Sequence, residues 1–250
     1  MTGRPRLSAL PLQAPFSTSG TVVFVFDGDT VKVKFEDGLE RRVRLIGADA
    51  PELDDQREKI ALWAQLAKRF AFFHLSGRRI RLTYDFEPLD KHGRVLAYIW
   101  TDEGRLFNEL MIARGFGHAF LSYPFRSDYQ RSFREAETEA RNEKRGLWRD
   151  EGPEAVSLDE ARPSLGDYVS IRFTPAEISE NRFYVYLSVA GRKFEALIPR
   201  ERRTLFPSAE TLRGKELVAT GLLEEFKGRL QIILFFPCQL ISVGLTSRPG

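Results

Sequence analysis

The feature that most constrains the fold is a stretch between residues 21 and 46 in which apolar and polar residues alternate, interrupted by two Asp-Gly pairs. Alternation with a period of two is typical of strands that bury one face, and Asp-Gly is a strong signal for a hairpin turn. The alternating apolar residues are Val23, Val25, Val31, Val33, Phe35, Val43 and Leu45. The pattern predicts a three-stranded antiparallel meander.

After this meander the apolar period lengthens to three and four residues, which is typical of an amphipathic helix. The expected elements are helices at 56–76, 108–114 and 128–145, and strands at 80–84 and 96–100. Five strands and three helices predict a mainly β domain with helices, of the α+β class, over residues 21–149. Residues 1–20 are broken by Pro5, Pro11 and Pro15, and we expect them to form a flexible N-terminal arm.

A second β-rich segment follows an acidic stretch. Glu151, Glu154, Asp159 and Glu160 mark residues 150–162 as an acidic linker. Further strands are expected around 169–173, 183–189, 194–198, 217–223 and 230–235, with a helical break at 199–207. This layout predicts a second small β-barrel of the OB type over residues 163–245.

Composition limits the class of protein and of site. Hydrophobic residues make up 42% of the 250-residue chain, which fits a folded globular protein without a membrane partner. The one cysteine, Cys238, excludes an intramolecular disulfide and a cysteine-based zinc site. The net charge of +3 is only a weak sign of a polyanionic partner. No signal peptide is visible, so we expect a cytoplasmic protein, or a secreted one if a signal was trimmed. We also expect a monomer.

Carboxylates and arginines gather where the predicted strands end. Asp29 follows the first Asp-Gly turn, and Asp49 and Glu52 follow the third strand. Carboxylate and carbonyl oxygens suit a hard cation such as calcium, and guanidinium groups at Arg44 and Arg94 match the geometry of phosphate. Together they favour phosphodiester hydrolysis. Plainer interpretations stay open for each residue alone: a hairpin turn needs no function, and a lone arginine is often a surface group.

Five short motifs carry a family resemblance. They are Asp27-Gly28-Asp29-Thr30, Arg44-Leu45, Asp49-Ala50-Pro51-Glu52, Lys91-His92-Gly93-Arg94 and Gly146-Leu147-Trp148. In this order and spacing they resemble the thermonuclease family typified by staphylococcal nuclease, over roughly residues 20–149. The resemblance implies an OB-type five-stranded barrel with three helices, dependence on Ca²⁺, and cleavage of DNA and RNA to 3′-phosphate ends.

The resemblance also implies roles by position. Asp29 and Asp49 correspond to calcium ligands, with the backbone carbonyl of Ala50 as a third. Arg44, Glu52 and Arg94 correspond to the catalytic residues, and Lys91, His92 and Tyr123 to residues that bind nucleic acid. Three positions depart from the family pattern. Ala50 stands where threonine is usual, which keeps the carbonyl but removes a hydroxyl that could hydrogen-bond in the calcium shell. His92 stands where tyrosine is usual and Leu121 where a base-stacking tyrosine is common, which affects base preference and affinity more than chemistry.

The strand at 183–189 is a candidate for a second surface that binds nucleic acid. If Phe183, Val185, Leu187 and Val189 face inward, Tyr184 and Tyr186 face outward. With Arg172 and Arg182 near by, they suggest a platform on which bases stack. The alternative is that this face packs on the first domain, or that the module mediates self-association.

A non-catalytic nucleic-acid-binding or scaffolding protein built on a nuclease-like domain is the competing function. Inactive relatives typically lose carboxylates or arginines of the site. The whole set, Asp29, Arg44, Asp49, Glu52 and Arg94, is present here, which favours catalysis.

Overall fold

The computed structural model describes residues 16–149 and 153–243. Residues 1–15 of the expected arm and residues 150–152 of the expected linker lie outside this range. Residues 16–20 are not separate from the fold, because the first strand already begins at Ser19. None of the helices in the described ranges is long and apolar enough to cross a membrane.

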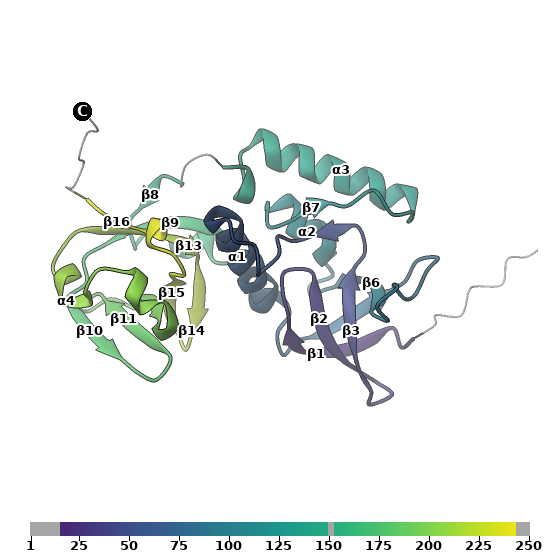
Figure 1. The fold of residues 1–250 in the computed structure, drawn as a ribbon, viewed down its shortest axis with the longest axis horizontal. Helices are drawn as coiled ribbons and strands as arrows, with labels where there is room; N and C mark the ends of the chain where they lie inside the picture. The colour runs from purple at the N-terminus through teal and green to yellow at the C-terminus, as the bar shows by residue number, and fades with distance from the viewer. Residues whose placement is uncertain (1–15, 150–152, 244–250) are drawn as a thin grey trace, which may run out of the picture.

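The N-terminal half is a closed five-stranded barrel with three helices, which confirms the predicted α+β class (Figure 1). The strand order is β1-β2-β3-β6-β5. The strands are β1 (Ser19–Val25), β2 (Thr30–Phe35), β3 (Glu40–Leu45), β5 (Arg79–Thr83) and β6 (Val95–Trp100). The helices are α1 (Glu58–Leu75), α2 (Phe107–Ala113) and α3 (Ser127–Asn142), followed by the 3₁₀ turn η1 (Gly146–Trp148). Closure leaves no free sheet edge.

The alternation in β1 differs from the expectation. The pairing of β1 with β2 shifts between Val22 and Phe24, as a β-bulge requires. The extra residue turns Val22 and Val25 toward the core, while Val23 is 42% exposed. Grouping Val23 with Val25 on one face was therefore wrong.

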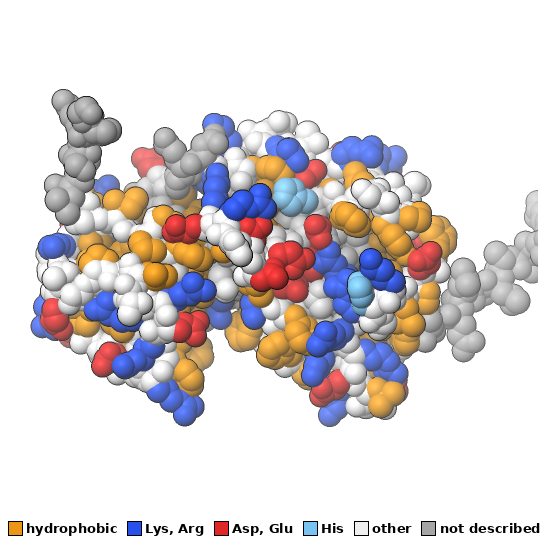
Figure 2. Space-filling model, in the orientation of Figure 1, with side chains coloured by type: hydrophobic (Ala, Val, Ile, Leu, Met, Phe, Trp, Pro, Cys, Tyr) orange, Lys and Arg blue, Asp and Glu red, His pale blue; other side chains and the backbone are white. Residues whose placement is uncertain are grey.

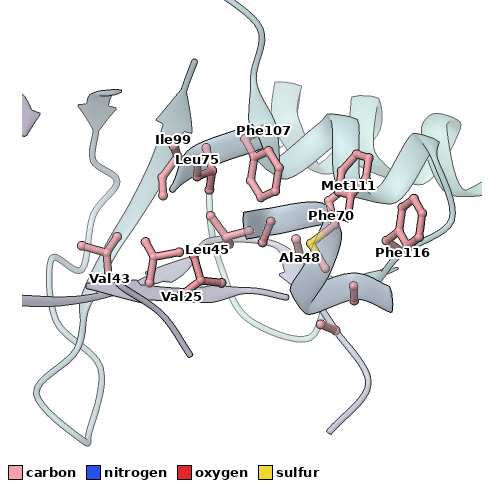
Figure 3. Close-up of a cluster of buried hydrophobic side chains, with 14 of the residues drawn as sticks. Val25, Val43, Leu45, Ala48, Phe70, Leu75, Ile99, Phe107, Met111 and Phe116 are labelled. Carbon is pink, nitrogen blue, oxygen red and sulfur yellow. The ribbon is translucent and has the colours of Figure 1, made fainter. Parts of the chain in front are cut away.

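One apolar core joins the barrel to its helices. Figure 3 shows Val25, Val43 and Leu45 of the barrel on one side of this cluster and Phe70, Phe107 and Met111 of the helices on the other. The strand residues are those that the period of two predicted, and the helix residues recur at helical spacing. This packing fixes the positions of β2 and β3 relative to α1.

A two-stranded ribbon, missing from the sequence prediction, lies beside the barrel. β4 (Ala48–Asp49) pairs antiparallel with β7 (His118–Ala119), with Asp49 opposite His118. Strands of two residues carry no periodic signal, so sequence patterning cannot find them. The ribbon ties the residues after β3 to the segment after α2.

The second β domain, residues 153–243, consists of two sheets. One has the order β10-β11-β12-β15-β14 and the other β16-β13-β9-β8. The strands are β8 (Ala155–Val156), β9 (Tyr168–Phe173), β10 (Glu177–Glu180), β11 (Tyr184–Ser188), β12 (Phe194–Pro199), β13 (Leu217–Leu222), β14 (Glu224–Phe226), β15 (Arg229–Ile233) and β16 (Leu240–Ser242). The helical pieces are η2 (Arg162–Ser164), η3 (Arg200–Leu205), α4 (Ala209–Leu212) and η4 (Pro237–Gln239). The described part of the acidic segment contributes β8, which pairs parallel with β9.

The two halves pack directly against each other, with α1 between them (Figure 1), and their surfaces adjoin in the space-filling view of the same orientation (Figure 2). The main hydrophobic cluster of the barrel includes Leu222, Phe235 and Phe236 of the second β domain. The ring of Trp63 in α1 lies 4.8 Å from that of Tyr168, centroid to centroid. The guanidinium of Arg69 in α1 also binds the buried carboxylate of Glu224, with Nε donating at 3.1 Å.

Candidate active site

The turn between β1 and β2 aims Asp29 at the site. The carboxylate of Asp27 accepts hydrogen bonds from the backbone N–H groups of Asp29 at 3.0 Å and Thr30 at 2.7 Å. A side chain at Gly28 would meet the methyl group of Ala50 at 2.7 Å and atoms of Ala67 and Met111 at 2.8 Å. Close packing therefore demands glycine here, and Asp27 holds the turn as the sequence predicted.

Asp29 is a buried carboxylate with every oxygen engaged. Its side chain accepts the hydroxyl of Thr30 at 3.0 Å and the backbone N–H of Ala50 at 2.6 Å, and the residue is 3% exposed. The Ala50 bond ties the β1–β2 turn to the loop after β4. The sequence brings these segments together only through the barrel, since 21 residues separate them.

Arg44 bridges the two predicted calcium ligands. Val43 and Leu45 point into the barrel core, so Arg44 between them points outward. Its guanidinium makes ion pairs with the carboxylates of both Asp29 and Asp49. Asp49 is held in place by the pairing of β4 with His118 on β7. The three residues therefore meet at one point.

Arg94 enters from the turn before β6. The carboxylate of Asp90 accepts the backbone N–H of Arg94 at 2.9 Å and its side-chain Nε at 2.7 Å, and Gly93 takes a left-handed conformation with φ of 75°. Burial raises the pKa of the Asp90 carboxyl, but the hydrogen bonds from Arg94 and His92 outweigh it, and the net shift is downward. Asp90 thus stays ionised and orients Arg94, a role that no sequence pattern indicated.

Arg44 and Arg94 both lie near enough to Asp27 to influence the pKa of its carboxyl. Burial raises the pKa of the Asp27 carboxyl above its ordinary value, while the hydrogen bond from the backbone of Thr30 and the positive charges of Arg44 and Arg94 oppose the rise. The parallel register of β3 and β6 explains this closeness, because Val43 is the partner of Val95 and Arg44 that of Leu96. Arg44 on β3 and Arg94, in the turn immediately before β6, therefore lie close together.

Glu52 lies apart from this cluster. It is exposed on the loop between β4 and α1, where its backbone carbonyl accepts the N–H of Asp55 at 3.4 Å. Within the described ranges its carboxylate has no hydrogen bond or ion pair. The structure therefore brings Asp29, Arg44 and Asp49 into contact, whereas Glu52, three residues beyond Asp49, does not take part in that contact.

The donor set fits a hard cation with few protein ligands. No cluster of three or more His, Cys, Asp or Glu side chains is placed to hold a metal ion in residues 16–149 and 153–243. The predicted ligands are instead two carboxylates and the carbonyl of Ala50. The contact of one guanidinium with both Asp29 and Asp49 shows that these carboxylates converge on a single positive group. Calcium accepts such oxygen ligands with water completing its coordination.

A cleft of about 560 Å³ extends from Arg94 along β3, lined by Glu40, Arg41, Arg42, His92, Gly93 and Arg94. Lys91 is exposed beside it. Arg42 stacks on Phe26 at 4.5 Å and has no carboxylate partner within the described residues. It was missed in the sequence, although it shares the outward face of β3 with Arg44. The structure therefore places Lys91 and His92 next to a basic cleft.

Tyr123 is anchored rather than free. Its hydroxyl donates a hydrogen bond to Glu87, and its ring is partly buried against the barrel core. Burial and the hydrogen bond to Glu87 raise the pKa of Tyr123 to about 12. Only part of the ring is left for a ligand.

The predicted residues of the second β domain do not form one site. Tyr184 and Tyr186 are half-buried and pack against the cluster that also contains Leu197 and Ile233. Arg182 stacks on Phe183 at 4.4 Å, whereas Arg172 lies on β9 in the other sheet and pairs with Glu216. Phe183 is 56% exposed in the turn before β11, so its expected inward position was wrong.

Comparison with known proteins identifies the family of the N-terminal half. The family model of staphylococcal nuclease homologues matches residues 42–150. A thermonuclease from Staphylococcus intermedius is 36% identical over 142 residues, which cover 54% of this chain and 83% of the relative. The chain belongs to the staphylococcal nuclease family.

Two further relatives agree with this membership. A thermonuclease from Staphylococcus hyicus is 33% identical, over 51% of this chain and 73% of its own length. An uncharacterized endonuclease from Escherichia coli is 30% identical, over 54% of this chain and 79% of its own length. This staphylococcal nuclease homologue is therefore a hydrolase of the nuclease class, and the second β domain lies beyond the matched family region.

Proposed function

We propose that this chain is a calcium-dependent nuclease that hydrolyses phosphodiester bonds of DNA, RNA or both and leaves 3′-phosphate ends. The observation that carries the proposal is the meeting of Asp29, Asp49 and Arg44, with Arg94 in the turn that leads into the neighbouring strand β6. Two carboxylates supply a cation site, and two guanidinium groups supply phosphate ligands that stay charged at any physiological pH.

Arg44 and Arg94 would bind the non-bridging oxygens of the scissile phosphate. A guanidinium fork matches two phosphate oxygens and stabilises the negative charge that grows on them in the transition state. Asp90 orients Arg94 through its Nε, which leaves the terminal nitrogens of Arg94 available to the substrate. Arg44 would exchange its carboxylate partners for phosphate as the site fills.

Glu52 would act as the general base. Its exposed carboxylate, without a partner in the described residues, can accept a proton from the attacking water. The water oxygen forms a bond to phosphorus, the bond from phosphorus to the 5′ oxygen breaks, and that oxygen takes up a proton. The phosphate then stays on the 3′ carbon of one product. Glu52 would act on the substrate from the loop after β4.

Asp29, Asp49 and the Ala50 carbonyl would hold the calcium ion. When bound, calcium neutralises phosphate charge and polarises the attacking water. The chain's own contribution is the rigid placement of these ligands, through the Asp27 turn and the pairing of β4 with β7.

We assign residues 21–149 as the catalytic domain and the β-rich segment near 163–245 as a substrate-binding module in a monomer. The exposed Arg182 and Phe183, in the turn just before β11, support contact with nucleic acid there. Lys91 and His92 beside the basic cleft support contact closer to the scissile bond.

The test is direct. The purified chain is incubated with single-stranded DNA, double-stranded DNA or RNA, in calcium, magnesium or EDTA, and the product ends are identified. We expect cleavage in calcium, 3′-phosphate ends, and none in EDTA. Arg44→Ala and Arg94→Ala should each lower the rate by about 10²-fold or more, whereas Arg213→Ala, a matched loss of surface charge, should not. A wild-type chain without activity on any of these substrates would refute the proposal.

A further inference from the structure

A pocket of about 270 Å³ lies at the junction of the two domains, away from the residues of the candidate active site. α1, α2 and the loop between β6 and α2 form most of its wall, and Leu165, Gly166 and Asp167 of the second β domain close it. Its volume is at the small end for ligand pockets, which favours a small ligand over an oligonucleotide. The pocket exists only because the second domain covers the end of α1.

His74 is the buried polar group of this pocket. It is 9% exposed and packs among Phe70, Phe73 and Phe107, whose ring centroids lie 4.4, 5.1 and 6.1 Å from its own. Neither ring nitrogen has a hydrogen-bond partner in the described residues. The only fully buried side-chain nitrogen or oxygen without a partner there is Nε1 of Trp148, so the nitrogens of His74 retain access to the pocket. Because these nitrogens are accessible and have no partner among the described residues, they can hydrogen-bond to a ligand in the pocket.

The charges around His74 are mostly positive. Arg78, Arg105 and Arg114 line the pocket together with only two carboxylates, those of Glu103 and Asp167. Glu103 is shared by Arg78 at 3.1 Å and Arg105 at 3.7 Å. Asp102, outside the pocket lining, also lies 3.7 Å from Arg78, and Asp167 binds Arg114 across the domain boundary. Burial first, and then the charges of Arg105 and Arg78, lower the pKa of His74 to about 4. A neutral imidazole offers one N–H donor, and three guanidinium groups favour an anion.

We propose that this interdomain pocket binds a phosphate monoester dianion, held by Arg78, Arg105 and Arg114 with a hydrogen bond from His74. Guanidinium groups bind phosphate through paired hydrogen bonds, and the dianion would compete with Asp102, Glu103 and Asp167 for the three arginines. Free phosphate and the terminal phosphate of a nucleotide share this chemistry.

The test uses the imidazole NMR signals of the full chain, which has only three histidines. In EDTA, so that no hydrolysis is needed, the chain is titrated with inorganic phosphate, a 3′-phosphomononucleotide, or the same nucleoside without phosphate. We expect a saturable shift of the His74 signal with both phosphates, and a rise in the pKa of His74 by about one unit or more, because a nearby anion favours the charged imidazole. Equal affinities indicate free phosphate as the ligand, and tighter nucleotide binding indicates a product end.

Variants test whether phosphate binds in this pocket. Arg105→Ala should weaken phosphate binding at least about tenfold, as the loss of a charge-assisted pair predicts. Arg213→Ala, with similar exposure and a similar surface ion pair, should leave it unchanged. The proposal is overturned if the nucleoside binds as well as the nucleotide, if Arg105→Ala binds phosphate like the wild type, or if only His92 responds. None of these readouts depends on nuclease activity, so they separate this proposal from the proposed function.

Discussion

Replacing Arg44 by alanine should destabilise the protein when calcium is absent, apart from any effect on catalysis. Arg44 is the common counter-ion of Asp29 and Asp49, and its side chain is only 15% exposed. Removing one partner of a buried ion pair typically costs about 3–5 kcal/mol, since the other charge stays buried. Asp29 keeps its hydrogen bonds from Thr30 and Ala50, and the Asp49 side chain is 41% exposed. We therefore expect the low end, about 3 kcal/mol.

For a chain of this size that loss corresponds to a fall in Tm of roughly 6–12 °C. The assay is thermal and urea unfolding of Arg44→Ala and wild type in EDTA and in calcium. Calcium should raise the Tm of the variant more than that of the wild type, because the ion no longer competes with Arg44 for the two carboxylates. Arg213→Ala, which removes an exposed pair, should change the stability by no more than about 1 kcal/mol. Equal stability of Arg44→Ala and wild type in EDTA would refute the shared counter-ion.

Four further outcomes follow from single contacts. Asp90→Asn should lower kcat by roughly tenfold to a hundredfold with little change in KM, because it loosens Arg94; steady-state kinetics with an unchanged kcat would contradict this. His74→Phe, studied without phosphate, should flatten the pH dependence of stability. The folded pKa of about 4 lies below the ordinary 6.5, so wild-type stability falls by up to about 3 kcal/mol as the pH drops from 6.5 to 4. If the urea midpoints of variant and wild type changed equally with pH, this prediction would be wrong. Gly28→Ala should cost about 1–3 kcal/mol by overpacking against Ala50, Ala67 and Met111, measured by urea unfolding; a neutral result would mean that the turn relaxes. Arg69→Met should lower the free energy of unfolding by about 3 kcal/mol, because the carboxylate of Glu224 is left buried and unpaired. The same substitution made in a Glu224→Gln variant should cost much less, and an equal cost in both backgrounds would contradict the ion pair.

The barrel and its site could be predicted because their signals are local. Alternation placed Val43 and Leu45 in the core and therefore Arg44 on the outer face, and the Asp-Gly pair placed the Asp27 turn. The bulge in β1 could not be predicted, because one inserted residue reverses the alternation that defines a face. The position of Asp49 also depends on a ribbon too short to show a period.

The part that could not be predicted was the partner and the burial of individual side chains. Asp90 orients Arg94 through one side-chain bond within a turn, which residue type alone does not indicate. Tyr184 and Tyr186 occupy the predicted face of β11, but the sequence could not decide between solvent and packing. The depth of His74 likewise depends on Gly166 of the second β domain, which is absent from any local pattern.

The place of α1 between two apolar surfaces bears on how this protein can be taken apart. A fragment ending at residue 149 would expose the flank of α1 that carries Trp63 and would leave Arg69 without its carboxylate. Such a fragment presents fresh apolar area to water, which favours aggregation. A loss of activity on truncation would then report solubility as much as substrate binding. The contribution of the second β domain is better measured by surface replacements in the intact chain, where the helix that follows the Glu52 loop keeps both of its neighbours.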